Sequence, residues 1–284
     1  MVADHAAYMV ATYARPPPVF VRGEGSWLWD LENRKYLDFT AGIAVTALGH
    51  GDRELTALMA EQARTLVHAS NLYHNPWTGA LAKLLVEATR AAGGMHDAAA
   101  VFVCNSGAEA NEAAIKFARK VGRALDPAGG KTEVVSAKAL GNGFPVGAAI
   151  VNRRVADAVR VGDHGTTFGG NPLACRLAHH LVSRLADPAL QRDVLRKEGL
   201  FRRGFADLRA RFPALVADVR GRGLLLGLQL TEDPGAVVTA ARERGLLVIT
   251  AGTNTLRFVP SLLVSDDEIQ LGLDILGDAI ASTR

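Results

Sequence analysis

The stretch VFVCNSGAEANEAAIKFARK, residues 101–120, passes from a short apolar run through a turn of small residues into a run of good helix formers. It predicts a strand that ends near Cys104 and a helix that begins near Gly107. At such a junction, free backbone N–H groups and the helix dipole can hold a phosphate, and the small Gly107 and Ala108 would let an anion approach closely. Ser106 would either donate its hydroxyl to that anion or act as an ordinary N-cap, and both readings stay open.

A second stretch, SAKALGNGFPVGAA at residues 136–149, places Lys138 directly after a β-branched strand pattern and before a glycine-rich turn. A lysine taken alone is usually a surface residue. Here the residues on both sides are small or apolar, and a partly desolvated lysine gives up its proton more readily, as an amine that attacks carbonyl compounds requires. Lys138 is therefore a candidate nucleophile.

Two further segments carry candidate ligand-binding side chains. GDHGTTFGGNPLA, residues 162–174, offers the hydroxyls of Thr166 and Thr167 before a helix with Asn171 as its cap, although an ordinary glycine-rich loop has the same pattern. Arg257 lies in the apolar strand pattern TLRFVPSL, residues 255–262. A guanidinium in such a strand needs a carboxylate, either a neighbour's or a substrate's.

The composition limits the class of protein. The chain has 284 residues, of which 49% are hydrophobic and 21% charged, and its helical and strand patterns alternate, so we expect an α/β protein. The net charge of +3 comes from basic residues mixed with acidic ones, which predicts solvated helix faces and no nucleic-acid partner. No apolar run is long enough to predict a membrane span. Cys104 and Cys175 lack metal-ligand spacing, which predicts no metal site, no disulfide and a reducing compartment.

The order of the patterns suggests three parts. Residues 1–50 contain an antiparallel meander, residues 51–218 form a large domain, and residues 219–284 form a small α+β domain. We expect helices over residues 53–70, 76–92 and 266–282, and a strand over residues 219–230.

The chain carries the phosphate turn, then the lysine, then the segment TTFGGNP. In this order of motifs it resembles the fold-type I pyridoxal-phosphate enzymes and, within them, the class III aminotransferases. YARPPPVFVRGEGSWLWD at residues 13–30 carries the same likeness, which covers nearly the whole chain. The resemblance implies a fold-type I α/β fold, pyridoxal 5'-phosphate as cofactor, and transamination. In detail the segments are most similar to the mitochondrial branch that uses N-acetylornithine and 2-oxoglutarate in arginine biosynthesis. Ornithine and 4-aminobutyrate, donors of other class III enzymes, remain alternatives.

The resemblance also implies residue roles. Lys138 would hold the cofactor and move the proton, and Gly107 and Ala108, beside Ser106, would hold the cofactor phosphate. Thr167 would bind the phosphate of the neighbouring subunit's cofactor in a homodimer. Thr166 would lie by the substrate, and Arg257 would bind the substrate α-carboxylate. The family's mitochondrial matrix location is expected, or else the cytoplasm, since residues 1–18 show no clear transit peptide.

One departure from the family lies between Val135 and Ala137. Members of the family carry a long block there, and this chain joins the two flanking strands directly. That block supplies the aromatic that stacks on the cofactor ring, an arginine and a glutamate of the substrate site, and the aspartate that faces the pyridinium nitrogen. We therefore expect an incomplete central sheet and slow turnover. The alternative is a non-catalytic product that keeps the dimer-forming parts of the family.

Overall fold

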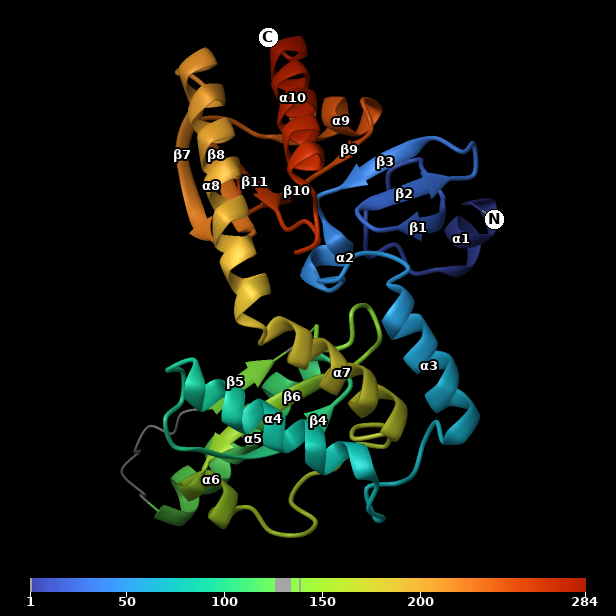
Figure 1. Cartoon of the computed structure of the whole chain (residues 1–284), viewed down its shortest axis with the longest axis vertical. Coiled ribbons are helices and arrows are strands. Elements are labelled where there is room, and N and C mark those ends of the chain that lie inside the picture. The colour runs from blue at the N-terminus through green and yellow to red at the C-terminus, as the bar shows by residue number, and fades with distance from the viewer. Residues whose placement is uncertain (1, 126–133, 138) are drawn as a thin grey trace.

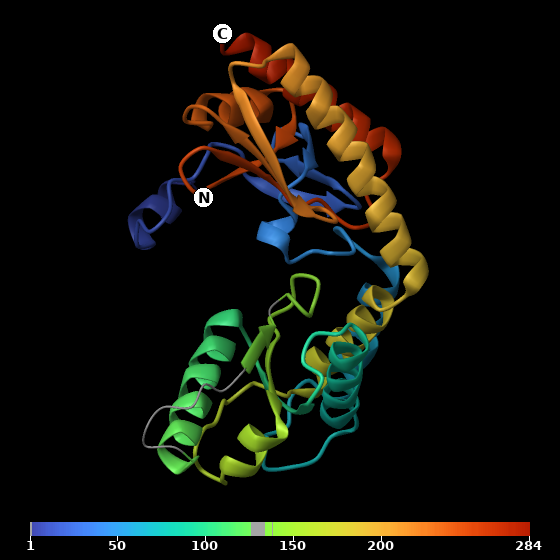
Figure 2. The same ribbon diagram turned by 90° about the vertical axis from the view of Figure 1, so that its left-hand side faces the viewer.

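A computed structural model describes residues 2–125, 134–137 and 139–284 of the chain. Figures 1 and 2 show two lobes. The middle of the chain forms one lobe, and the N-terminal segment joins the last third of the chain in the other. The chain passes between the lobes twice, near α3 (Arg53–Thr65) and where α7 (Pro172–Leu185) is followed by α8 (Pro188–Arg211).

The middle lobe is built on a sheet of three described strands. β4 (Ala98–Cys104) and β5 (Val134–Ala137) flank β6 (Gly147–Asn152), which runs antiparallel to both. Cys104 pairs with Gly147, and Ala137 pairs with Ala148. The carboxyl ends of β4 and β5 therefore lie along the same edge of the sheet, the edge at which β6 begins, with β6 between them.

Helices cover both faces of this sheet. Ala148 and Ile150 of β6 pack with residues of α4 (Pro76–Ala91) and α7, whereas Ala149 and Val151 pack with α5 (Gly107–Leu125) and α6 (Arg153–Ala158). The alternation follows from the two-residue period of a strand. Because both faces are apolar, β6 is buried along nearly all of its length.

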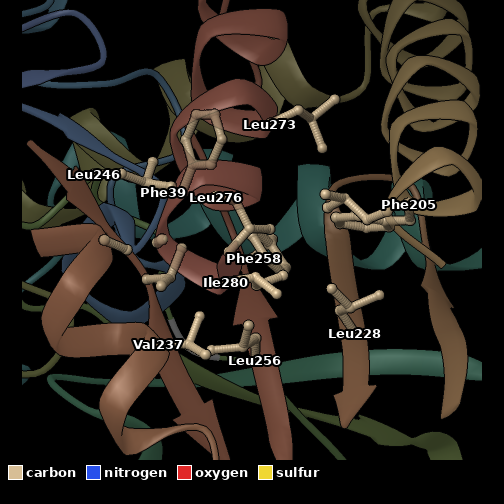
Figure 3. Packing of buried hydrophobic residues seen from close by; sticks show 14 of the residues in the cluster. Phe39, Phe205, Leu228, Val237, Leu246, Leu256, Phe258, Leu273, Leu276 and Ile280 are labelled. Carbon is tan, nitrogen blue, oxygen red and sulfur yellow. The ribbon is translucent and has the colours of Figure 1, made fainter. Parts of the chain in front are cut away.

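The other lobe contains the larger core. An antiparallel sheet in the order β10 (Ile249–Ala251), β11 (Thr255–Phe258), β8 (Leu225–Leu230), β7 (Val216–Arg222) is covered on one face by α8, α9 (Gly235–Glu243) and α10 (Asp266–Ser282). Figure 3 shows the core side chains that meet there, among them Phe205, Leu228, Leu256 and Phe258. This packing fixes which face of each strand is turned away from the core.

The N-terminal segment joins this second lobe. After α1 (Val2–Tyr8), β1 (Phe20–Glu24), β2 (Trp27–Asp30) and β3 (Lys35–Asp38) form the expected meander, and β9 (Leu246–Leu247) extends it by pairing parallel to β3. α2 (Ala41–Ala44) follows β3 on the side that faces the middle lobe (Figure 1). Segments 208 residues apart in sequence, Asp38 and Leu246, thus lie in one sheet.

Two sequence predictions need correction. The helix expected over residues 53–70 ends at Thr65, because Leu66 adopts an extended backbone. The strand expected over residues 219–230 is a hairpin of β7 and β8, which turns at Gly223 with φ of 59°. A left-handed residue at a hairpin turn is strongly favoured by glycine, so the reversal falls where the sequence permits it.

Candidate functional site

The predicted phosphate turn joins β4 to α5. Ser106 Oγ accepts a hydrogen bond from Glu109 N at 3.2 Å, so the serine caps the helix. In the described chain, no acceptor is recorded for the N–H groups of Gly107 and Ala108, and Ala108 is exposed. Two free N–H groups at the positive end of a 19-residue helix fit a phosphate.

The loop before α7 lies against this turn. Thr166 Oγ1 donates toward Glu109 Oε2 at 3.3 Å and accepts from Asn105 Nδ2 at 3.2 Å. The same carboxylate oxygen accepts from Asn105 N at 3.1 Å. The Thr166 hydroxyl is therefore engaged in holding the two loops together. Thr167 is exposed, and no hydrogen bond of its hydroxyl is recorded to any described residue.

Gly169 allows the close approach of these loops. A Cβ at Gly169 would overlap Val103 O and the Thr166 side chain, and would lie 3.0 Å from Cys104 Cα. Asn71 Nδ2 donates to Gly169 O at 2.7 Å and so fixes the loop from its other side. Sequence reasoning identified neither Asn71 nor Glu109, since both act across long separations in sequence and carry no local motif.

Lys138 lies outside the described residues. Its described neighbours, Ala137 and Ala139, show at which edge of the sheet the chain leaves β5. Ala137 ends β5 opposite Ala148, and Ala139 has a φ of 66°. β4 and β5 are two strand spacings apart, about 9–10 Å. The chain on either side of Lys138 therefore leaves the sheet at the same edge as the turn that opens α5.

The turn after Lys138 contacts the other lobe through Asn142. Its Oδ1 accepts from Leu48 N at 2.7 Å, and its Nδ2 donates to Gly49 O at 3.0 Å. The φ of Asn142 is 50°, a conformation that asparagine tolerates better than most residues. The glycines at 141 and 143 predicted the turn, but nothing local predicted this contact.

Arg257 lies on the other lobe, in β11. Its neighbours Leu256 and Phe258 are part of the core, so the Arg257 side chain emerges from the opposite face of the sheet. The residue is half-buried, and within the described part of the chain its side chain has no recorded ion pair or hydrogen bond. A partly desolvated guanidinium of this kind can bind a ligand carboxylate.

The two cysteines are free and buried. Burial raises the pKa of both thiols, Cys104 and Cys175, to about 11. A thiol in that range is protonated near neutral pH and is a poor nucleophile. Neither cysteine is therefore a rival to Lys138 for covalent chemistry.

Comparison with known proteins gives the family. The model of the aminotransferase class-III family matches residues 8–137 and 133–280. The chain belongs to the class III aminotransferase family. The mitochondrial acetylornithine aminotransferase of Neurospora crassa is 49% identical over 98% of this chain and 86% of its own length. The corresponding Saccharomyces cerevisiae protein is 33% identical over 98% of this chain and 95% of its own length.

Solved structures agree on the fold. The N-acetylornithine aminotransferase of Stenotrophomonas maltophilia superimposes with a TM-score of 0.85 at 30% identity, over 100% of this chain and 99% of its own. The ornithine aminotransferase of Toxoplasma gondii reaches 0.89 at 21% identity, over 99% and 94%. The predicted fold class is therefore confirmed, and the chain is a transaminase by family. In the described residues, no helix combines the length and the apolar character needed to cross a bilayer.

The alignments also bear on chain length. The Neurospora crassa alignment extends over 398 positions, 114 more than the 284 residues of this chain. At least 114 positions therefore have no residue here. The two matched parts of the family model meet at residues 133–137.

Proposed function

We propose that this chain uses pyridoxal 5'-phosphate to transfer the amino group of N-acetylornithine to 2-oxoglutarate, giving N-acetylglutamate semialdehyde and glutamate. The observation that carries the proposal is the shared sheet edge. The free N–H groups of Gly107 and Ala108 and the chain that flanks Lys138 both lie there. The relatives named acetylornithine aminotransferase support this choice of substrates.

The residues at this edge fit the proposed cofactor at its phosphate end. Gly107 and Ala108 offer N–H donors without bulk, and the Ser106 hydroxyl keeps its own proton to donate. Bound pyridoxal phosphate supplies a ring that accepts the electron pair left when the bond between the substrate α-carbon and its hydrogen breaks. Lys138 Nζ would take that proton and return it one step later. Arg257 would hold the substrate carboxylate and so orient the α-carbon.

The remaining assignments complete the proposal. Thr167 would reach the cofactor phosphate of a neighbouring subunit, and Thr166 would lie by the substrate. A homodimer is supported by exposed apolar side chains beside these loops: Leu72 is 85% exposed and Phe168 is 60% exposed. Relatives named as mitochondrial support the mitochondrial matrix as location. Residues 51–218 and 219–284 would be the large and small domains, with the segment 1–50 before them and with α8 of the large domain packed on the core of the small one.

We further propose that turnover is slow because the chain lacks the block that the family carries between Val135 and Ala137. The surplus of 114 alignment positions supports this reading. Two of the three acidic residues at the start of α10, Asp266 and Glu268, already have structural partners. Glu268 closes a capping box with Ser265, and Asp266 binds Arg196 at 2.7 Å. These carboxylates stabilise the helix start and do not replace a lost cofactor-facing group.

Borohydride reduction in the presence of pyridoxal phosphate tests the proposal. We expect a single labelled peptide that contains Lys138. Ala108→Asp should weaken cofactor affinity far more than Ala108→Ser, because the aspartate charge would oppose the phosphate. Labelling spread over surface lysines, unchanged in Lys138→Ala, would contradict the lysine assignment. Equal affinities for the two Ala108 variants would contradict the phosphate site.

Turnover is measured separately with N-acetylornithine, ornithine and 4-aminobutyrate as donors. We expect conversion with N-acetylornithine only, at a rate at least tenfold below that of a version with the block restored at equal cofactor occupancy. A rate within about tenfold, a barrier difference of about 1.4 kcal/mol, would contradict the proposed loss. A chain that binds the cofactor and converts no donor would be the non-catalytic alternative.

A further inference from the structure

Two arginines flank a glycine across the outer face of the β7–β8–β11 sheet. Arg257 of β11 pairs with Gly227 of β8, and Gly227 pairs with Arg220 of β7. Residues directly opposite each other in antiparallel strands project to the same side. Leu226, Leu228 and Phe258, the alternate residues, lie in the core. Arg220 and Arg257 therefore share the face turned away from the helices, two strand spacings or about 9–10 Å apart.

Neither cation is neutralised by the described residues around it. The Arg257 side chain has no recorded partner in the described chain, and the Arg220 guanidinium lies 3.9 Å from Asp218 Oδ2. Both side chains of that pair are more than half exposed, at 55% and 60%. An exposed pair at this distance contributes about 0–1 kcal/mol, so Arg220 remains available to a ligand anion.

Gly227 keeps the space between the two arginines open. A Cβ there would lie 3.0 Å from Thr255 Cγ2, which is tighter than ordinary packing, and 3.4 Å from Arg220 Cγ. Because Gly227 has no side chain, only backbone lies between the two arginines on this face. Any side chain at this position would stand between the two charges.

A pocket lies at the turn end of the β7–β8 hairpin. Its volume is about 280 Å³. It is lined mainly by small and apolar side chains, some of them from α8 and the core, together with one more arginine: Ala41, Ala44, Val194, Leu224, Leu225, Val259 and Arg222. Arg222 pairs with Leu225, two register positions from the pair of Arg220 and Gly227. Neither Arg220 nor Arg257 lines this pocket, so the arginine pair itself carries the argument. Two separated cations on one face of a sheet suit a short carbon chain with a carboxylate at each end.

We propose that Arg220 binds the second carboxylate of the dicarboxylate substrate, while Arg257 binds the first. The inference rests on the proposed function, which assigns a substrate carboxylate to Arg257 and a five-carbon 2-oxo dicarboxylate as amino acceptor. An amino donor with a single free carboxylate would use Arg257 alone. Arg220 would thus separate the acceptor from monocarboxylates without affecting the donor.

The test uses glutarate and pentanoate, which have five carbons and two or one carboxylates, and measures their binding by calorimetry at constant ionic strength. We expect the wild-type chain to prefer glutarate. Arg220→Gln should weaken glutarate binding about tenfold and leave pentanoate within about twofold. Arg220→Lys should retain part of the preference, because the charge stays while the planar fork is lost. Arg209→Gln, on the exposed side of α8, is the matched control.

The outcomes separate this inference from the proposed function. Loss of both ligands in Arg257→Gln, with loss of glutarate alone in Arg220→Gln, supports both. If Arg257→Gln weakens both ligands and Arg220→Gln weakens neither, or weakens both equally, the second-carboxylate role is overturned and the Arg257 assignment stands. If Arg257→Gln changes neither ligand, the carboxylate site of the proposed function fails, and this inference fails with it.

Discussion

Replacing Gly169 by alanine should separate the loop before α7 from the end of β4. The added methyl would overlap Val103 O and lie 3.0 Å from Cys104 Cα, and these are backbone atoms that cannot rotate away. Overpacking of this kind costs about 1–3 kcal/mol. A shifted loop would also strain the hydrogen bonds of Gly169 with Asn71, at 2.7 Å, and with Thr166, at 3.2 Å, each worth about 1 kcal/mol. We expect a loss of about 2–4 kcal/mol.

Gly165→Ala is the matched control, because it adds the same methyl to the same loop where no atom lies within 4 Å. Its unfolding free energy should stay within about 0.5 kcal/mol of the wild type. Urea unfolding followed by fluorescence gives both values. Pyridoxal-phosphate affinity should fall in Gly169→Ala and not in Gly165→Ala, since only the former disturbs the turn at Ser106. A Gly169→Ala protein with the wild-type urea midpoint would refute the reasoning.

Two further predictions concern buried polar contacts. Burial opposes ionisation of Asp38, but hydrogen bonds from His50 and Thr40 outweigh it and hold the pKa of Asp38 below its usual value. The stability that this carboxylate contributes is therefore present above about pH 4 and is lost as the pH falls through the pKa of Asp38 in the folded state. Asp38→Asn should therefore reduce the change in urea midpoint between pH 5 and pH 3. An unchanged difference would count against this role of Asp38. Asn142→Gly should raise the hydrogen-exchange rate of the Leu48 amide, measured by NMR, about fivefold. Asn142→Asp keeps the acceptor oxygen and should raise this rate less. Equal exchange rates in the two variants would contradict the contact.

Helix starts were predictable where an N-cap residue directly precedes the helix. Asp52, Asn75, Asn171 and Asp187 each accept hydrogen bonds from the first turn of the helix that follows. These signals act over two or three residues, and a sequence displays them openly. The hairpin of β7 and β8 was predicted less well, because the sequence around Gly223 lacks the Asn-Gly or Asp-Gly pair that marks most tight turns.

The site was predictable in its parts and not in its assembly. The turn at Ser106 and the loop at Thr166 carry recognisable motifs. That the two loops are joined through Glu109, and that the second is fixed by Asn71, depends on contacts across 57 and 98 residues. Such contacts follow from sheet order and helix packing. A polar residue that makes such a long-range contact has the same local sequence pattern as a polar residue exposed to solvent.

The segment between β3 and α3 fixes the relation between the two proposed anchors. On one side, Val259 N, two residues after Arg257, donates to Phe39 O, and Leu262 N donates to Ala47 O. On the other, the turn after Lys138 attaches to the same segment through Asn142. Within it, Ala41 to Ala44 hold φ values of 43° to 64°, a conformation that costs non-glycine residues about 1–2 kcal/mol each.

Strain of this size persists only where the surroundings determine the backbone. Here the surroundings include Lys197 of α8, which is only 5% exposed and donates to Leu262 O at 3.0 Å while pairing with Asp193 at 2.6 Å. Removing the lysine would leave Leu262 O and the Asp193 carboxylate without this buried cation, and would loosen the residues that follow Arg257. The strained turn thus lies in the segment that binds both the turn after Lys138 and the residues after Arg257, so a change in this segment should shift these two parts of the chain relative to each other.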